Sequence, residues 1–219
     1  MIDFTGVTAV TIPEGAVVRI TDAAGTVLWE KPTSGNLPTG YTPREYIEFT
    51  GKQAVDTVVI PDSNTRIESV FVRKSTDTRY LYGVLSTDHT ASVTAYLATT
   101  SGNWRYCGTT KTLGVSANVK HTASQDRNGV VLDGTLTSYS GVSNVTAPKS
   151  LVIGSARNTS GGLESAFFVG LIYGFKMYNG DALAADYVPC SDPDGVFGFW
   201  DKVTSTFKSS ITDTPLQGG

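Results

Sequence analysis

From Phe168 to Gly180 the chain reads FVGLIYGFKMYNG, and this stretch decides the fold. Large apolar residues alternate with small or polar ones along it, which is the pattern of a strand with one buried face. The Asn179-Gly180 pair at its end is typical of a tight turn between antiparallel strands. The chain continues as DYVPC over Asp186–Cys190 and as GVFGFWD over Gly195–Asp201. We therefore expect the C-terminal third to be antiparallel β-sheet.

The composition is that of a folded, turn-rich β protein. Hydrophobic residues make up 40% of the 219 residues and charged residues 17%, and there are 23 glycines. This length suffices for one β-sandwich with a sizeable core. The net charge of -3 gives no electrostatic reason to expect nucleic acid or an anionic membrane surface as a partner. We find no signal-peptide pattern at the start and no apolar stretch long enough to span a bilayer, so membrane insertion is not expected.

The N-terminal residues predict a small β unit. Val7–Ile12, Val17–Ile20 and Val27–Trp29 have strand patterns separated by turn residues. Three short strands with so few apolar side chains are marginal alone, so this unit needs a neighbour. A Pro-, Gly- and Ser-rich linker follows. The expected division is residues 1–31 as an anchoring or oligomerisation unit, 32–43 as a linker, 44–212 as the main domain, and 213–219 as a flexible tail.

Strand candidates recur at short intervals throughout the main domain, as in a sandwich. One of them is the long alternating run Ala54–Ile60, and only Ala182–Asp186 suggests a short helical turn. Strand-only patterning at this length predicts two packed antiparallel sheets, in the arrangement of a jelly roll.

Three motifs carry a resemblance to a known family. The main domain opens with YIEFTGKQAVDT over Tyr46–Thr57 and closes with the stretches from Phe168 to Cys190 and with DGVFGFWDK over Asp194–Lys202. In these motifs, which bracket about residues 44–208, the chain resembles the concanavalin A-like (laminin-G-like) jelly-roll domains of bacteriophage and prophage virion proteins. The resemblance implies an all-β, concanavalin A-like jelly-roll sandwich of two antiparallel sheets, preceded by the small N-terminal β unit.

The same resemblance implies a role. It points to a capsid fibre, decoration or tail subunit that is made in the bacterial cytoplasm and exposed on the surface of the virion. The implied partners are other virion proteins, through residues 1–31, and a host-surface or mucosal glycan bound by the jelly roll. A homo-oligomer is expected. The alternative is a purely structural protein that stabilises the particle.

An enzymatic function is not expected, although glycoside hydrolases share this fold. Retaining hydrolysis needs two carboxylates about 5 to 5.5 Å apart. The chain has no Glu-x-Asp-x-x-Glu run, and Glu45 and Glu48 would face opposite sides of a strand. His89 and His121 lie in no recognisable catalytic motif, and we expect them to be surface or strand residues. A glycoside hydrolase remains the less favoured alternative.

Carbohydrate binding needs exposed aromatic faces beside amide, carboxylate or guanidinium groups. Trp104, Arg105 and Tyr106 follow Gly102-Asn103, which suggests a turn, and therefore form the first candidate site. Further candidates are Tyr139, Arg157 and Asn158. Core positions are the other interpretation; it is as well supported as a binding site for Trp104 and better supported for Tyr106. Trp29 and Trp200 are expected in the core.

No cofactor is expected. Asp192–Gly195 superficially resembles a calcium loop, but it lacks the EF-hand spacing, and a turn is the favoured interpretation. Calcium binding is therefore an open alternative that no motif supports. Cys107 and Cys190 are expected to be free, buried thiols, because no export signal is found.

Overall fold

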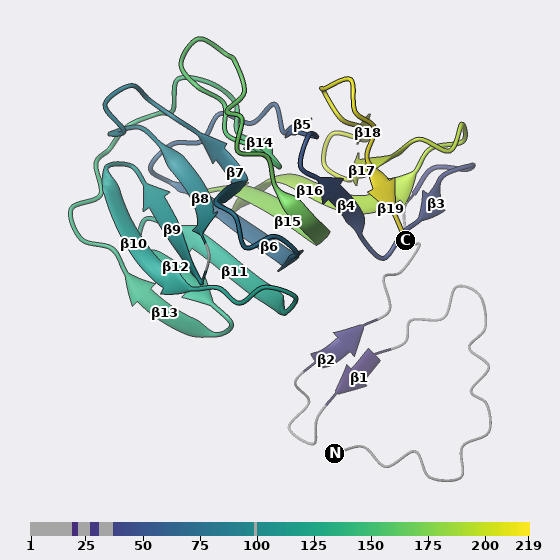
Figure 1. The fold of residues 1–219 in the computed structure, drawn as a ribbon, viewed down its shortest axis with the longest axis horizontal. Helices are drawn as coiled ribbons and strands as arrows, with labels where there is room; N and C mark the ends of the chain where they lie inside the picture. The colour runs from purple at the N-terminus through teal and green to yellow at the C-terminus, as the bar shows by residue number, and fades with distance from the viewer. Residues whose placement is uncertain (1–18, 22–26, 31–36, 99) are drawn as a thin grey trace.

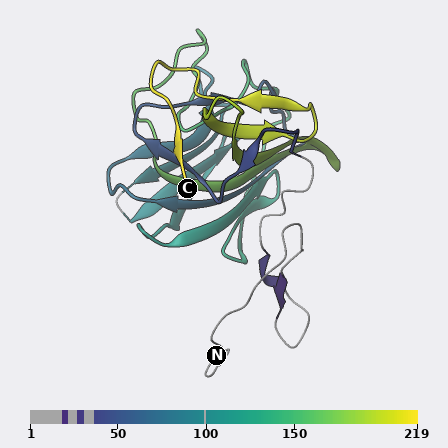
Figure 2. The ribbon, with the colours of Figure 1, turned by 90° about the vertical axis from the view of Figure 1, so that its right-hand side faces the viewer.

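The computed structural model describes residues 19–21, 27–30, 37–98 and 100–219. These residues form strands, turns and loops without a helix (Figures 1 and 2). Within them, accordingly, no helix is long and apolar enough to cross a membrane.

Two antiparallel sheets build the main domain. The six-stranded sheet has the order β10 (Thr109–Gly114), β9 (Ser101–Tyr106), β8 (Val93–Ala98), β7 (Arg79–Val84), β14 (Val152–Ile153) and β5 (Val55–Asp56). The eleven-stranded sheet has the order β13 (Thr135–Ser138), β12 (Gly129–Leu132), β11 (Lys120–Asp126), β6 (Thr65–Arg73), β15 (Val169–Asn179), β16 (Ala182–Ser191), β17 (Phe197–Asp201) and β18 (Thr206–Lys208). Three short strands also belong to it, namely β3 (Thr42–Pro43), β4 (Ile47–Thr50) and β19 (Gln217–Gly218). The fold is the predicted all-β jelly-roll sandwich.

The core lies between the sheets, and side chains alternate between the core and the outer face along strands such as β6 and β11. Along β6 every second residue is buried, from Thr65 to Arg73. The largest fully buried side chains come from both sheets and include Phe71, Tyr82, Trp104 and Phe175. Burial of one such side chain stabilises the fold by about 1.5–3 kcal/mol.

A buried polar network joins the two sheets. Gln125 on β11 is fully buried and accepts a hydrogen bond from the Tyr82 hydroxyl of β7 at 2.8 Å. Its amide nitrogen donates to the carbonyl of Arg105 at 3.0 Å and to the Tyr139 hydroxyl at 2.7 Å. The Tyr139 hydroxyl in turn donates to the carbonyl of Trp104 at 3.0 Å. Because these buried polar groups have hydrogen-bond partners, the bonds offset the cost of removing them from water, and the network favours one relative position of the sheets.

The opening stretch of the sequence forms the predicted strand, β15, which pairs with β6 from Gly170 to Asn179 and, on its other edge, with β4 along Val169–Ile172 and with β16 along Phe175–Asn179. The turn lies one residue later than predicted, because Asn179 still pairs with Ala182 and the two connecting residues are Gly180 and Asp181. Gly180 has a φ of 57°, a conformation that glycine adopts without a steric penalty.

The helical turn expected at Ala182–Asp186 is wrong, because these residues begin β16. They pair with the end of β15, where Ala185 lies opposite Met177. Cross-strand pairing and the burial of Ala185 outweigh the weak helix propensity of an alanine-rich pentapeptide.

The flexible tail expected over residues 213–219 is also wrong. Gln217 and Gly218 form β19, which pairs with β4, and Leu216 is 3% exposed. The Gly219 carbonyl accepts hydrogen bonds from the backbone nitrogens of Glu45 at 2.7 Å and Tyr46 at 3.3 Å. This segment therefore extends the eleven-stranded sheet.

The predicted strand Ala54–Ile60 is shorter than expected, since only Val55 and Asp56 pair, as β5. Val58 then adopts a φ of 56°, which a β-branched residue rarely does. Its backbone nitrogen donates to a carboxylate oxygen of Asp56 at 2.9 Å, so a local turn ends the strand.

At the N-terminus, β1 (Arg19–Thr21) and β2 (Val27–Glu30) pair as an antiparallel hairpin in a sheet of their own. They overlap the second and third predicted strands. The first, Val7–Ile12, and most of the predicted linker lie outside the described residues. Thr42 and Pro43, at the end of that linker, pair with β16 as β3. The division of the chain into an anchor, a linker and a main domain stays a prediction.

Candidate functional site

The outward face of the six-stranded sheet carries a groove with a volume of about 490 Å³. Its lining side chains come from four neighbouring strands and from the β7–β8 loop. They are Tyr80, His89, Thr94, Tyr96, Asn103, Arg105 and Thr110.

Strand register arranges these residues in two rows across the sheet. In the first row, Tyr80 of β7 lies opposite Tyr96 of β8, which lies opposite Asn103 of β9. In the second row, Thr94 of β8 lies opposite Arg105 of β9, which lies opposite Thr110 of β10. Alternate residues of a strand face the same side, so β8 and β9 each add one residue to both rows, while β7 adds one to the first row and β10 one to the second.

A tight turn sets the β9–β10 register. Cys107 and Gly108 connect the two strands and both have positive φ, at 43° and 89°. A two-residue connection with this geometry matches the twist of a hairpin. It places Thr109 opposite Tyr106, and Thr110 therefore faces outward beside Arg105.

Two tyrosines form the aromatic wall of the groove. The ring centroids of Tyr80 and Tyr96 are 4.3 Å apart and their planes meet at 38°. Both side chains are half-buried, so part of each ring faces solvent. Burial raises the pKa of Tyr80 to about 12, and Tyr96 and Glu164 contribute to the rise. The Tyr80 phenol is therefore neutral at physiological pH and can both donate and accept a hydrogen bond.

Asn103 and Arg105 supply the polar groups beside the rings. The Asn103 side-chain oxygen accepts a hydrogen bond from the Thr112 hydroxyl at 2.7 Å. Arg105 donates through Nε to the Thr110 hydroxyl at 3.3 Å. These contacts use the Asn103 oxygen and Arg105 Nε, so the Asn103 amide nitrogen and the terminal guanidinium nitrogens have no side-chain hydrogen bond to another described residue. Stacking surfaces with amide, guanidinium and hydroxyl groups beside them are the chemistry expected of a saccharide site.

Arg105 is the one predicted site residue that lines this groove. Gly102 and Asn103, which suggested a turn, lie inside β9, and the strand begins at Ser101. The alternation therefore directs Trp104 and Tyr106 inward, where both are 0% exposed. The expectation of an exposed Trp104 is wrong, and the core interpretation holds for both residues.

The remaining predicted residues have structural contacts elsewhere. Tyr139 is buried in the network of Gln125 and stacks on Tyr106, with ring centroids 6.0 Å apart. Arg157 pairs with the Asp56 carboxylate at 2.9 Å and also contacts the Ser150 hydroxyl. The Asn158 side-chain oxygen accepts hydrogen bonds within its own loop, including one from the backbone nitrogen of Gly162 at 2.9 Å. None of these three residues lines the groove.

Asp56 anchors that loop in its ionised form. Burial alone raises the pKa of its carboxyl group, but hydrogen bonds from the Val58 backbone, Ser150 and Arg157, together with the charge of Arg157, outweigh burial. The pKa of Asp56 therefore lies below its ordinary value.

Sequence reasoning missed Tyr80 and Tyr96, although strand candidates recur throughout the main domain, and it missed Asn103 because Gly102-Asn103 suggested a turn. The available signal was outward alternation along neighbouring strands. Which outward residues become neighbours depends on register, and a bulge between Tyr80 and Tyr82 shifts it. That bulge has no local sequence mark.

The histidines take up the surface and strand positions that were expected. His89 lies in an exposed turn with a φ of 61° at the edge of the groove. His121 on β11 is 4% exposed, and its Nε2 donates to the Ser116 carbonyl at 3.0 Å. Its Nδ1 lies 2.7 Å from a carboxylate oxygen of Asp133. Both ring nitrogens of His121 therefore have structural partners.

Asp192–Gly195 is the predicted turn. The Asp192 carboxylate accepts hydrogen bonds from the backbone nitrogens of Asp194 at 3.0 Å and Val196 at 2.8 Å. No group of three or more His, Cys, Asp or Glu side chains among the described residues has the arrangement of a metal site. Cys107 and Cys190 are free and buried, as predicted.

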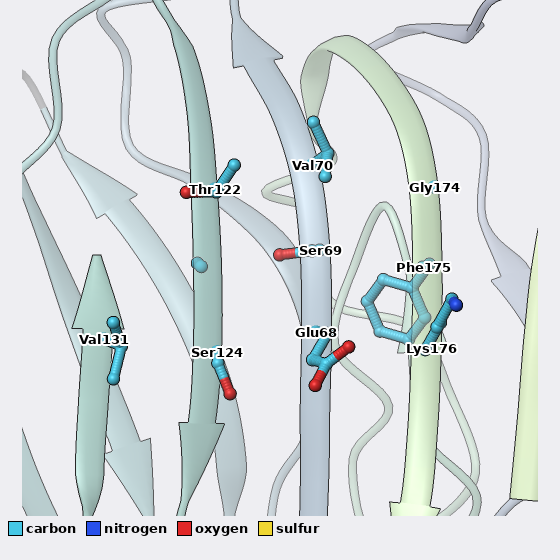
Figure 3. Close-up of a pocket in the computed structure, with 10 residues that line it drawn as sticks. Glu68, Ser69, Val70, Thr122, Ser124, Val131, Gly174, Phe175 and Lys176 are labelled. Atoms are coloured by element: carbon cyan, nitrogen blue, oxygen red, sulfur yellow. The ribbon is translucent and has the colours of Figure 1, made fainter. Parts of the chain in front are cut away.

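The outward face of the eleven-stranded sheet has a smaller depression, of about 300 Å³, on β6, β11, β12 and β15 (Figure 3). Val70 and Val131 supply aliphatic surface, and Gly174 leaves the centre open. Its charged groups are engaged, because Glu68 pairs with Arg66 at 3.4 Å and Lys176 lies 3.8 Å from Asp186. This depression has no exposed aromatic ring.

An aromatic cluster lies elsewhere on the eleven-stranded sheet. Trp200 is half-buried, so its expected core position is wrong, and its ring centroid lies 5.1 Å from that of Tyr41. Phe207 packs against Tyr41 at 5.6 Å. These three rings therefore shield one another from solvent. Trp29 was also predicted to lie in the core, but its side chain is not among those that the structure describes.

Comparison with known proteins finds structural similarity only. No family model matches the chain. No curated protein matches its sequence. A native heptameric SAP-like pentraxin from Limulus polyphemus superposes with a TM-score of 0.46 and 12% identity, over 61% of this chain and 75% of the pentraxin chain. Domains LG4-5 of the mouse laminin α1 chain superpose with a TM-score of 0.46 and 9% identity, over 86% of this chain and 48% of the laminin chain.

Proposed function

We propose that this protein is a non-enzymatic, carbohydrate-binding jelly roll of a phage or prophage virion protein. Its partner would be a glycan of the host surface or of mucus. The single observation that supports binding is the groove of the six-stranded sheet, where the Tyr80–Tyr96 wall stands beside Asn103 and Arg105. A stacking surface fixes the plane of a sugar ring, and the polar groups select its hydroxyls.

The virion role rests on a different support, the resemblance of the opening and closing motifs. In this proposal the protein is a capsid fibre, decoration or tail subunit exposed on the particle. Residues 1–31 attach it to other virion proteins or to further copies of itself. If a chain of residues 37–219 formed the same oligomer as the full chain, the anchoring role of residues 1–31 would be wrong.

The proposal of binding without catalysis is supported by the groove's own groups. The described residues that line it are two phenols, an imidazole, an amide, a guanidinium group and hydroxyls, with no pair of carboxylates. Retaining and inverting hydrolysis both depend on such a pair.

A structural role as a particle stabiliser is the second candidate. The depression of the eleven-stranded sheet favours it, because its aliphatic lining and engaged charges fit a protein contact better than a sugar. In that case the groove would bind no ligand. The two candidates therefore differ in whether the groove binds a glycan.

The test is a binding screen of the full chain against bacterial surface polysaccharides and mucin glycans, followed by titration calorimetry. We expect Tyr96→Ala to weaken binding by at least about tenfold, which corresponds to about 1.4 kcal/mol. Trp200→Ala removes a half-buried aromatic side chain from the other sheet and serves as the matched control, which should bind like the unchanged chain.

Two results would contradict the proposal. Loss of binding in Trp200→Ala with full binding in Tyr96→Ala would place the site on the other sheet. Absence of saturable binding to every glycan at millimolar concentration would leave the structural role. Circular dichroism of each variant would show that the fold is retained.

A further inference from the structure

Three arginines of the protein pair with a carboxylate, and the arginine of the groove is not among them. Arg66, Arg79 and Arg157 each pair with a carboxylate, at 3.4, 3.0 and 2.9 Å. Arg105 meets no carboxylate within ion-pair distance among the described residues. Its one side-chain hydrogen bond there runs from Nε to the Thr110 hydroxyl.

This arrangement leaves the outer edge of the guanidinium group uncommitted. Nε is held by Thr110, so the planar group is anchored at its base while its two terminal nitrogens remain available. Two parallel N–H groups of a guanidinium match the two oxygens of a carboxylate, and such bidentate pairs are the strongest of the hydrogen-bonded ion pairs.

The surroundings of the Arg105 guanidinium group strengthen its attraction for an anion. Arg105 is half-buried between Thr94 and Thr110 in its row, and neighbouring protein excludes part of the water around it. Among the described residues no carboxylate lines the groove, and the other titratable residues that line it are Tyr80, Tyr96 and His89. Glu164 is close enough to act on Tyr80 electrostatically, but it is not a lining residue.

The charge of the groove is opposite to that of the whole chain. The chain carries a net charge of -3, which does not attract an anion. At physiological salt such long-range repulsion is screened beyond about 8 Å. The local contact with Arg105 therefore determines whether the groove attracts an anion.

We propose that the groove selects an acidic saccharide and binds its sugar carboxylate through Arg105, with the pyranose ring against Tyr80 and Tyr96. This inference rests on the proposed function, because it names the ligand class of the same groove. It adds that the ligand is a carboxylated polysaccharide such as a hexuronate polymer.

The experiment compares acidic polysaccharides with their own neutral forms. Polygalacturonate, alginate and hyaluronate are each tested beside the polymer whose carboxyl groups have been reduced to primary alcohols, which keeps the backbone and removes the charge. Binding of the full chain is measured by calorimetry at physiological salt. We expect at least one acidic polymer to bind at least about tenfold more tightly than its reduced partner, as for a charge-assisted hydrogen-bonded pair.

Variants assign the preference to one side chain. Arg105→Gln should abolish the preference for the acidic form, and Arg105→Lys should retain part of it, because lysine keeps the charge and loses the planar fork. Arg66→Gln removes a paired arginine from the other sheet and is the matched control, which should bind like the unchanged chain. Dextran sulfate tests whether negative charge alone is sufficient.

The outcomes separate this inference from the proposed function. Equal binding of the acidic and reduced polymers, a preference that survives Arg105→Gln, or equally tight binding of dextran sulfate would overturn the inference. If neutral glycans then still bound and Tyr96→Ala weakened them, the proposed function would stand. If no polymer bound in either form, the inference would fall, and the proposed function would fall with it only if the screen of bacterial surface polysaccharides and mucin glycans also gave no saturable binding.

Discussion

Trp104 shows how one residue can satisfy a surface pattern and yet belong to the core. It lies at 0% exposure between the sheets, its ring centroid is 6.2 Å from that of Tyr82, and its carbonyl accepts a hydrogen bond from Tyr139. Its neighbour Arg105 faces the groove. A large change at Trp104 therefore alters the support beneath the groove and not the groove's own surface.

Trp104→Ala should lower the free energy of unfolding by about 3–5 kcal/mol, since it leaves a cavity in the core. Trp104→Phe, which keeps an aromatic ring there, should cost clearly less. Urea denaturation followed by circular dichroism measures both. Any loss of glycan binding in Trp104→Ala should therefore disappear from Trp104→Phe; loss in both folded variants would mean that Trp104 contacts the ligand.

Gln53, in the opening motif, is another residue whose role is structural. It is 1% exposed, its side-chain oxygen accepts hydrogen bonds from the backbone nitrogens of Thr50 and Lys52, and its amide nitrogen donates to the Pro215 carbonyl at 3.0 Å. Asp56, from the same motif, holds Arg157. The polar residues of this motif therefore join distant segments of the chain and do not form a site.

At the scale of elements, the C-terminal strand β19 is small but highly connected. It pairs with β4, it follows the buried Leu216, and the Pro215 carbonyl before it accepts the hydrogen bond from Gln53. Such a strand stabilises the sheet by covering an edge as well as by burying apolar surface.

Removal of residues 213–219 should destabilise the protein by more than about 2 kcal/mol, because truncation of one buried leucine already costs 2–5 kcal/mol. Thermal unfolding monitored by circular dichroism measures the change. Gln217→Ala, an exposed position whose backbone pairing is kept, should stay within about 0.5 kcal/mol of the unchanged chain. An unchanged melting temperature after the truncation would show that β19 contributes nothing to stability.

The contrast between elements and site shows what could be predicted from sequence. Alternation and turn residues predicted most strands, including β15 and, to within one residue, the turn that follows it, because these signals are local. β19 could not be predicted, since it becomes a strand only by pairing with the distant β4. The Ala182–Asp186 segment pairs with the adjacent end of β15, but its alanine-rich sequence has no clear strand alternation of its own. The groove depends on the register of β7, β8, β9 and β10 together, so Arg105 alone was found.

For the whole molecule, stability at alkaline pH depends on buried phenols. Burial raises the pKa values of Tyr82, Tyr106, Tyr139 and Tyr187 above the ordinary value near 10. Each hydroxyl also makes a hydrogen bond to a described residue, for example from Tyr187 to the Thr57 carbonyl at 2.7 Å.

The free energy of unfolding should accordingly be insensitive to these groups below about pH 10 and fall as the pH rises above it. The sign follows because the unfolded chain ionises its phenols first, which favours unfolding. Absorbance at 295 nm and circular dichroism, recorded together during alkaline titration, measure the effect. We expect the late phenolate signal to appear with loss of β structure; its appearance in the intact fold would contradict the burial of these side chains.

The Gly219 carbonyl, bonded to the backbone nitrogens of Glu45 and Tyr46, brings the end of the sandwich next to its beginning. Figure 1 shows this meeting point at the opposite end of the domain from β8, β9 and β10. Adjacent termini of this kind suit circular permutation. In a chain that lacks residues 1–41, a short peptide could join residue 219 to residue 42 at the start of β3, and new ends could open at the exposed Asp133-Gly134 turn. The order of the strands along the chain would then change while the groove kept its shape.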